Sequence, residues 1–409
     1  MGESVDGEGN GSGLTREQRE RFDNAYAIWQ RGELASVAHI GAANFRAFRD
    51  LSLSPGRLTA LVGPNAAGKS SIIDLFRFVS DALNLSLYTA LERRGGLRAV
   101  RHTAPGGRPR NVKVEIALEF GDGFGGVYAF RTDAKAGGTY SVGEEIARTW
   151  KDDYIIDEFV VRGGRVINPG DDFFRPRPTA PHDPTALGLP IYGSSPGLFP
   201  ILDALRELRA YSIVPDRLRE LQDPDEGARL LFDGRNAASV LRHLSDDGRQ
   251  ELEEMLAHVV PGIVGVRTVQ RGNKLTLEFT QHTERGDNHF EALQMSDGTL
   301  RLLGLLLALY QSATPRFMAV EEPEATIHVA ALQALMEVFQ ARTPYTQVLL
   351  TTHSAEILDS VPIDDVYLVE AQDGFSRLGP VSEESMAVVQ RALFSPGELL
   401  RSGELRGRL

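Results

Sequence analysis

The chain has 409 residues, a net charge of −12 and a hydrophobic fraction of 42%, values that suit a globular protein with a sizeable core. It contains no cysteine, which excludes disulfides, cysteine-ligated zinc, iron–sulfur clusters and thiol nucleophiles. The acidic balance argues against a protein that coats nucleic acid and leaves room only for a local basic patch. No apolar run reaches about 18 residues and no secretory leader is evident, so we expect a cytoplasmic protein without a membrane span.

In the first half of the chain, a flexible tail (1–13) and an amphipathic helix (15–31) are predicted to precede a series of strands. Strand patterns occur at 37–42, 44–48, 51–53, 58–62, 112–120, 126–132 and 155–162. The alternating segments among them predict an antiparallel sheet.

In the second half, eight of the 21 prolines lie between Pro169 and Pro200, which predicts an extended surface loop. Helices are expected at 199–210, 236–245 and 248–258, and a hairpin at 264–269 with 274–279. Alternation of strand and helix then returns at 317–320, 329–341, 347–351 and 366–369, which predicts a parallel core split by the middle of the chain.

The predicted fold is therefore α/β, a mixed sheet with antiparallel N-terminal strands and an inserted helical and β lobe. We expect a tail and N-terminal helix (1–36), a first part of the main domain (37–165), a proline-rich loop with an inserted lobe (166–290), and a second part of the main domain with a C-terminal tail (291–409).

A glycine-rich phosphate-binding loop is the strongest motif. It runs Gly63, Pro64, Asn65, Ala66, Ala67, Gly68, Lys69, Ser70 and Ser71, between an apolar strand and a helix. Glycines let backbone N–H groups converge on phosphates, Lys69 supplies a positive charge for the β- and γ-phosphates, and Ser70 offers an oxygen to Mg²⁺. The chain has only five lysines among 44 basic residues, so Lys69 is expected to have a role.

Two carboxylates, Glu321 and Glu322, end the apolar strand that starts at Phe317, an arrangement typical of a Walker B element. The first carboxylate can hold Mg²⁺ through water and the second can polarise the attacking water. A second apolar strand ends at His353, whose ring can hydrogen-bond a γ-phosphate. The alternative for Glu321 and Glu322 is an acidic strand end that leads into a turn at Pro323. Taken alone, His353 would indicate a structural histidine, and the P-loop on the same chain favours the functional interpretation of all three residues.

Ser296 and Gly298 open a strongly apolar helix. Free N–H groups at such a helix start can bind an anion. The same residues equally suit an N-cap formed by Ser296 or Asp297.

Taken together, these elements resemble the head of ABC-type ATPases, and within them the branch of RecF, the SMC-like proteins and the overcoming-lysogenisation-defect nucleases. The segment 44–48 resembles the N-terminal strand motif of that branch, and 321–328 resembles its Walker B element running into the D-loop. The resemblance implies that Ser296 and Gly298 form the signature motif, Glu322 is the catalytic base and His353 is the switch histidine. It also implies ATP and Mg²⁺ as cofactors and a head-to-tail homodimer, or a higher even oligomer, in which Ser296 and Gly298 contact ATP on the other chain.

A basic stretch from Arg93 to Arg110 contains six arginines and no acid. It predicts either a solvated loop or a contact with the nucleic-acid backbone. No Toprim nuclease domain fits after His353, so a nuclease would be a separate protein. The leading hypothesis is a stand-alone ATPase that dimerises on ATP and gates a partner effector, a nuclease in DNA repair or anti-phage defence. The alternatives are the ATP-binding subunit of a membrane transporter and a nucleotide-dependent scaffold with little turnover.

Overall fold

The computed structural model describes residues 35–103, 107, 109–168, 182–260 and 262–409. The predicted tail (1–13) and the helix expected at 15–31 lie outside these residues. Within the described residues, no helix is long and apolar enough to cross a membrane.

The N-terminal part of the large sheet is antiparallel, as predicted. Its strands are β1 (Ser36–Phe45), β2 (Phe48–Leu53), β4 (Asn111–Gly121), β5 (Phe124–Ala134), β6 (Tyr140–Lys151), β7 (Tyr154–Arg162) and β8 (Arg165–Asn168). They pair in the order β8-β7-β6-β5-β4-β1-β2. The sequence pattern did not predict β6.

The other part of the sheet carries the parallel strands. They are β3 (Leu58–Val62), β9 (Leu208–Tyr211), β13 (Phe317–Glu321), β14 (Gln347–Thr352) and β15 (Val366–Gln372), in the order β15-β3-β14-β13-β9. A further strand, β16 (Phe375–Pro380), pairs antiparallel with β15 and joins β2 in parallel. The predicted parallel core is therefore confirmed, and it is continuous with the antiparallel part.

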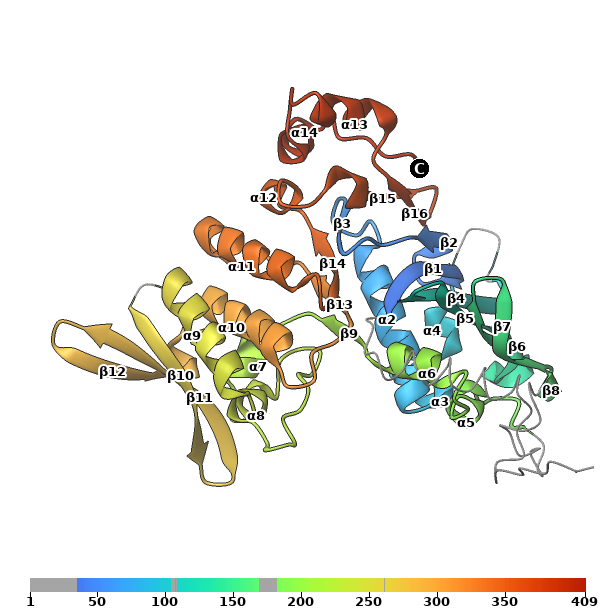
Figure 1. Ribbon diagram of the computed structural model, residues 1–409, viewed down its shortest axis with the longest axis horizontal. Coiled ribbons are helices and arrows are strands. Elements are labelled where there is room, and N and C mark those ends of the chain that lie inside the picture. Colours follow the sequence, from blue (N-terminus) through green and yellow to red (C-terminus); the bar gives the residue numbers. More distant parts are fainter. Residues whose placement is uncertain (1–34, 104–106, 108, 169–181, 261) are drawn as a thin grey trace, which may run out of the picture.

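Helices cover both faces of the parallel strands (Figure 1), which is why most side chains on both faces of these strands are apolar. On one face lies α2 (Lys69–Asn84), where the Phe76 ring stacks on Phe317 with centroids 4.4 Å apart. On the other face lie α10 (Asp297–Tyr310) and α11 (Val329–Arg342). Alternate residues of β3 divide between these two cores, with Leu61 in the first and Ala60 and Val62 in the second.

A lobe of short helices and a small sheet packs against α10 (Figure 1). It contains α7 (Pro215–Arg219), α8 (Ala237–Arg242), α9 (Asp246–Val259), β10 (Ile263–Arg271), β11 (Lys274–Thr283) and β12 (Gly286–Glu291). The predicted hairpin is confirmed, with Arg271 opposite Lys274 at its turn. The sequence pattern did not predict β12.

The remaining helices are short. They are α3 (Leu87–Glu92), α4 (Leu97–Val100), α5 (Leu189–Tyr192), α6 (Phe199–Arg206), α12 (Ala355–Leu358), α13 (Glu383–Gln390) and α14 (Pro396–Ser402).

The prediction for the proline-rich segment was wrong over its described part, 182–200. Helix α5 forms there and α6 begins there, and Leu187, Leu189 and Leu198 are buried. Pro190 and Pro200 stand in the first helical turn, where a missing N–H costs nothing.

The predicted end of the helix at 199–210 was also wrong. The helix stops at Arg206, because residues 208–211 form β9 and pair in parallel with β13.

Candidate functional site

The P-loop connects β3 to α2 through backbone geometry that only glycine fits well. Gly68, the residue before the helix, has a φ of 109° in the left-handed region. A Cβ atom on Gly68 would also collide with the Ser376 hydroxyl, and a Cβ on Gly63 would collide with the Val369 carbonyl oxygen. The loop is therefore held closely between α2, β15 and β16.

The side chain of Lys69 turns back over this loop. Its Nζ donates to the carbonyl oxygens of Gly63 at 2.8 Å and Pro64 at 3.1 Å, and lies 2.8 Å from Nε2 of His353. Burial lowers the pKa of Lys69, while the charges of Glu322, Glu324 and Glu321 act in the opposite direction. The ammonium group thus lies among carboxylates at the mouth of the P-loop.

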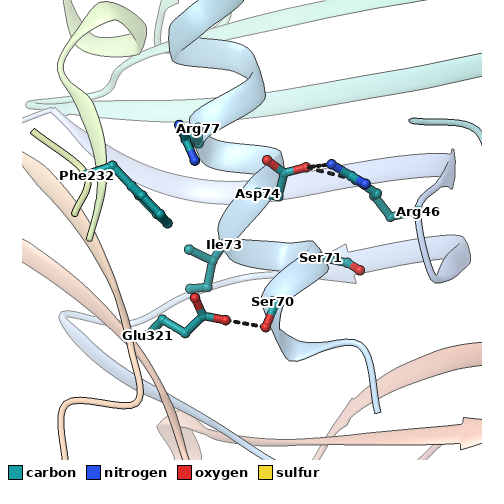
Figure 2. Close-up of a pocket in the computed structure, with 8 residues that line it drawn as sticks. All are labelled: Arg46, Ser70, Ser71, Ile73, Asp74, Arg77, Phe232 and Glu321. Atoms are coloured by element: carbon teal, nitrogen blue, oxygen red, sulfur yellow. Dashed lines mark hydrogen bonds and ion pairs between the residues drawn. The ribbon is translucent and has the colours of Figure 1, made fainter. Parts of the chain in front are cut away.

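Ser70 and Glu321 meet beside the P-loop (Figure 2). The Ser70 hydroxyl hydrogen-bonds Oε1 of Glu321, and both residues line a cavity of about 320 Å³. Glu321 is the last residue of β13, opposite Thr351 of the parallel strand β14.

The donor set of Ser70 and Glu321 fits Mg²⁺. No cluster of three or more His, Asp or Glu side chains suited to a metal occurs in the described residues. In nucleotide sites Mg²⁺ needs only one or two protein oxygens, because phosphate and water supply the rest. Ser70 and Glu321 place one hydroxyl and one carboxylate at a single point, as such a site requires.

Glu322 adopts a backbone conformation that is uncommon for a residue with a side chain. Its φ is 42°, and its N–H donates to the carbonyl oxygen of Thr351 at 3.0 Å and to the Thr351 hydroxyl at 3.1 Å. These bonds hold the residue while its Oε1 lies 3.2 Å from Nε2 of His353. Such conformations are typical of functional sites.

Glu324, to which the sequence assigned no separate role, fixes the end of β14. Its Oε1 accepts hydrogen bonds from the Thr352 hydroxyl and from the backbone N–H of His353, both at 2.7 Å. The carboxylate therefore orients the segment that carries the histidine ring. The only signal in the sequence is a third glutamate after the two of the Walker B element.

Ser296 and Gly298 lie at the start of α10, away from the cavity that contains Ser70. The Ser296 hydroxyl accepts from the N–H of Thr299 at 3.2 Å, so the N-cap interpretation is confirmed. A Cβ on Gly298 would lie 2.5 Å from the carbonyl oxygen of Thr326. Ser296 is exposed, and neither residue lines the cavity beside Glu321.

Five side chains that the sequence did not assign to the site line the same cavity: Arg46, Ile73, Asp74, Arg77 and Phe232 (Figure 2). Arg46, in the turn between β1 and β2, is held by Asp74 at 2.8 Å. Arg77 follows Ser70 by seven residues and so lies on the same face of α2. That spacing was the one signal available in the sequence.

The basic stretch is partly neutralised inside the molecule. Arg94 is nearly buried and pairs with Asp74 and Asp81, each at 2.9 Å, and Arg93 pairs with Asp81 at 3.2 Å. Arg108 lies outside the described residues.

Comparison with known proteins places this site in a family. A family model described as an AAA domain, putative AbiEii toxin of a type IV toxin–antitoxin system, matches residues 58–359. The chain belongs to this AAA domain family. The match runs from β3 past the histidine at the end of β14, so it includes all of the P-loop, carboxylate and histidine elements. Among curated proteins, none matches the chain.

Solved structures with the same fold include heads of SMC proteins. An Smc head bound to the C-terminal winged-helix domain of ScpA matches with a TM-score of 0.55 and 15% identity, over 86% of this chain and 99% of that one. An Smc head with an extended coiled coil, bound to the C-terminal domain of ScpA from Pyrococcus furiosus, matches with a TM-score of 0.52 and 13% identity, over 88% and 100%. At this identity the likeness shows the fold alone. The predicted fold class is confirmed: this member of the AAA domain family has the fold of a P-loop ATPase head. A P-loop ATPase family implies nucleotide binding, usually with Mg²⁺.

Proposed function

We propose that this protein binds ATP with Mg²⁺ and hydrolyses it to ADP and phosphate. The observation that carries the proposal is the convergence of three side chains on one point. Lys69 and Glu322 both contact Nε2 of His353, at 2.8 and 3.2 Å. The three residues come from three separate segments of the chain.

Each residue has a distinct task in this reaction. The backbone from Gly63 to Ser71 surrounds the phosphates, and Lys69 donates to the β- and γ-phosphates. Mg²⁺, held by Ser70 and Glu321, would neutralise the charge on the phosphates. Glu322 accepts a proton from the attacking water as the catalytic base, and His353 hydrogen-bonds the γ-phosphate.

ATP is proposed to join two copies of the chain head to tail. Ser296 and Gly298 are the proposed signature residues, and they lie outside the cavity beside their own Ser70. A second copy could therefore present them to the nucleotide. The Ser296 hydroxyl also lies 2.9 Å from the Thr299 hydroxyl, and either can be the donor of that pair. When Thr299 donates, the Ser296 hydrogen is available to a nucleotide.

The dimer is proposed to gate a separate effector in the cytoplasm, a nuclease in DNA repair or anti-phage defence, as in the RecF and overcoming-lysogenisation-defect branch. Two findings support a partner protein. The family description refers to toxins of toxin–antitoxin systems, and the Smc heads with this fold were solved bound to ScpA domains. A nucleic-acid contact through Arg93 to Arg110 stays part of the proposal.

Phosphate release tests the catalytic proposal. Turnover of Glu322→Gln is expected to fall at least about 100-fold, because a positioned general base contributes 10² to 10⁴ in rate. Glu337→Gln, an exposed glutamate of α11, is the matched control and should keep the wild-type rate. Equal turnover in wild type and Glu322→Gln would remove Glu322 from catalysis.

Sedimentation of Glu322→Gln tests the dimer. With ATP and Mg²⁺ the variant is expected to shift from monomer to dimer, because it holds ATP without consuming it. An unchanged monomer population at saturating ATP would contradict the composite site. ATP-dependent dimers with negligible phosphate release by the wild type would favour the scaffold instead.

A further inference from the structure

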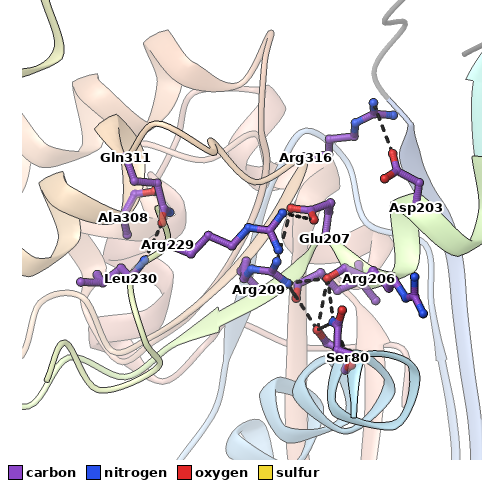
Figure 3. A network of polar contacts seen from close by, with 12 residues as sticks. Ser80, Asp203, Arg206, Glu207, Arg209, Arg229, Leu230, Ala308, Gln311 and Arg316 are labelled. Atoms are coloured by element: carbon purple, nitrogen blue, oxygen red, sulfur yellow. Dashed lines mark hydrogen bonds and ion pairs between the residues drawn. The ribbon is translucent and has the colours of Figure 1, made fainter. Parts of the chain in front are cut away.

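A second cavity, of about 630 Å³, lies behind the Mg²⁺ side of the P-loop, between the later turns of α2, strand β9 and the segment 229–235. Five arginines line it: Arg77, Arg93, Arg209, Arg229 and Arg235. Figure 3 shows part of its wall, where Arg209, Glu207 and Ser80 form a network around the start of β9. This set differs from the basic stretch that the sequence indicated, since only Arg93 belongs to both.

Too few carboxylates face this set to neutralise it. Among the described residues, three carboxylates form ion pairs with arginines of this set, and each of the three is shared by two guanidinium groups. The groupings are Asp81 with Arg93 and Arg94, Glu207 with Arg209 and Arg229, and Asp233 with Arg217 and Arg235. The cavity therefore keeps an excess of positive charge, which favours an anionic ligand.

Arg77 is the most informative member of the set. Its guanidinium carbon lies 4.1 Å from the centre of the Phe232 ring, and no carboxylate of the described residues lies within ion-pair distance of it. Burial lowers the pKa of Arg77, while Asp81 and Asp74 oppose the shift from farther away. A half-buried arginine whose donors have no acceptor in the described chain is suited to receive acceptors from a ligand.

The cavity has the size and lining of a small-molecule site. Its volume falls within the range of about 300 to 1,000 Å³ that such ligands occupy. Leu208, Leu230 and the Phe232 ring add apolar surface between the arginines. Arg77 and Phe232 also line the cavity of Ser70 and Glu321, so the two cavities share a wall.

From these observations we propose that the arginine-lined cavity binds a small phosphorylated ligand of the nucleotide class, separate from the nucleotide at the P-loop. Its phosphates are held by Arg77, Arg93 and Arg229, and its ring lies against the apolar wall. Arg93, Arg229 and Arg235 are about half exposed, so a ligand can enter the cavity from solvent. The proposal does not depend on ATP hydrolysis.

Calorimetric titration with inorganic tripolyphosphate, without Mg²⁺, tests the site in the full chain. The substitution Lys69→Ala weakens phosphate binding at the P-loop. We expect this variant to show one remaining binding event, at the arginine-lined cavity. In that background Arg77→Gln and Arg229→Gln should each weaken the remaining event at least about tenfold, because each removes charge-assisted hydrogen bonds to phosphate. Arg285→Gln, on the exposed turn between β11 and β12, is the matched control and should bind as the background does.

Three results would overturn the proposal. The first is the absence of any tripolyphosphate binding in the Lys69→Ala protein, and the second is equal binding in Arg77→Gln and the control. The third is displacement of tripolyphosphate by a short single-stranded oligonucleotide that binds at least about tenfold more tightly, which would assign the arginines to a nucleic-acid backbone. Arg77→Lys and a comparison of melting temperatures separate loss of binding from loss of folding, since the lysine variant keeps the charge.

Discussion

Nζ of Lys69 lies 2.8 Å from Nε2 of His353, the same nitrogen that lies 3.2 Å from Oε1 of Glu322. An ammonium group has only donors, so Nε2 must accept when it bonds Lys69, and the ring proton is then on Nδ1. A contact with the Glu322 carboxylate requires the opposite, a proton on Nε2. Nε2 can therefore hydrogen-bond either Lys69 or Glu322, but not both at a time. We expect that phosphate bound by Lys69 changes which of these two residues is the partner of Nε2.

Removing the Lys69 ammonium should remove ATP affinity. Lys69→Ala is expected to raise the Kd for ATP at least about tenfold, since hydrogen bonds to a charged group contribute about 1.5 to 3 kcal/mol. Equilibrium binding of a labelled ATP analogue measures the change. Lys274→Ala, which loses only a surface pair with Asp223, is the control and should bind like the wild type. Unchanged affinity in Lys69→Ala would mean that the loop does not bind the phosphates.

Glu324 is expected to act as a positioning residue for His353. Glu324→Ala loses the acceptor for the His353 N–H and the Thr352 hydroxyl, so kcat should fall about tenfold while the KM for ATP changes little. Glu324→Gln keeps an amide oxygen at the same place and should restore most of the rate. Steady-state kinetics of the two variants measure this difference. Equal losses in both, or a change in KM alone, would argue against positioning.

Ser296 is expected to have two separable roles. Ser296→Ala removes the N-cap of α10 and should lower the free energy of unfolding by about 1 kcal/mol, measured by urea denaturation. Ser296→Asp restores a good N-cap and therefore the stability. Its carboxylate would repel the phosphates of a facing nucleotide, so ATP-dependent dimerisation should still be lost.

That pair of variants distinguishes the cap from the signature motif. If Ser296→Asp dimerises on ATP as the wild type does, Ser296 only caps the helix and the facing contact must involve other residues.

Glu145 should make stability depend on pH. Burial raises its pKa to about 7, although the N–H groups of Gly188 and Leu189 and the Tyr128 hydroxyl oppose the shift. A raised pKa means that the folded protein prefers the protonated carboxyl. Its contribution is then fully present below about pH 4.5 and lost as the pH rises through about 7.

Relative to Glu145→Gln, the free energy of unfolding of the wild type should therefore fall by up to about 3 kcal/mol between pH 5 and pH 8. Urea denaturation at several pH values measures the difference between the two proteins. Glu144→Gln, which loses a surface pair with Arg162, should run parallel to the wild type. Parallel curves for Glu145→Gln would show that Glu145 is not the titrating group.

Motifs written in contiguous residues were predictable from the sequence. The P-loop is one segment whose glycines have a local steric reason, and the apolar runs before Gly63 and Glu321 define their strands without any partner. The β9 strand was not predictable, because Leu208 to Tyr211 continue a helical pattern and become a strand only by pairing with β13. The prolines of α5 and α6 led to the wrong prediction of an extended loop. Pro190 and Pro200 would break the interior of a helix, yet both suit its first turn.

The sequence by itself therefore determined the presence of a nucleotide loop, two strand-end carboxylates and a strand-end histidine. Only the tertiary structure decided that Lys69, Glu322 and His353 meet at one nitrogen, that Glu324 holds the histidine segment, and that Arg77 stands between two cavities. The physical reason is the separation along the chain of the residues that make each contact. A loop or a strand end follows from neighbouring residues, whereas these contacts form when parallel strands far apart in the chain end at the same edge of one sheet.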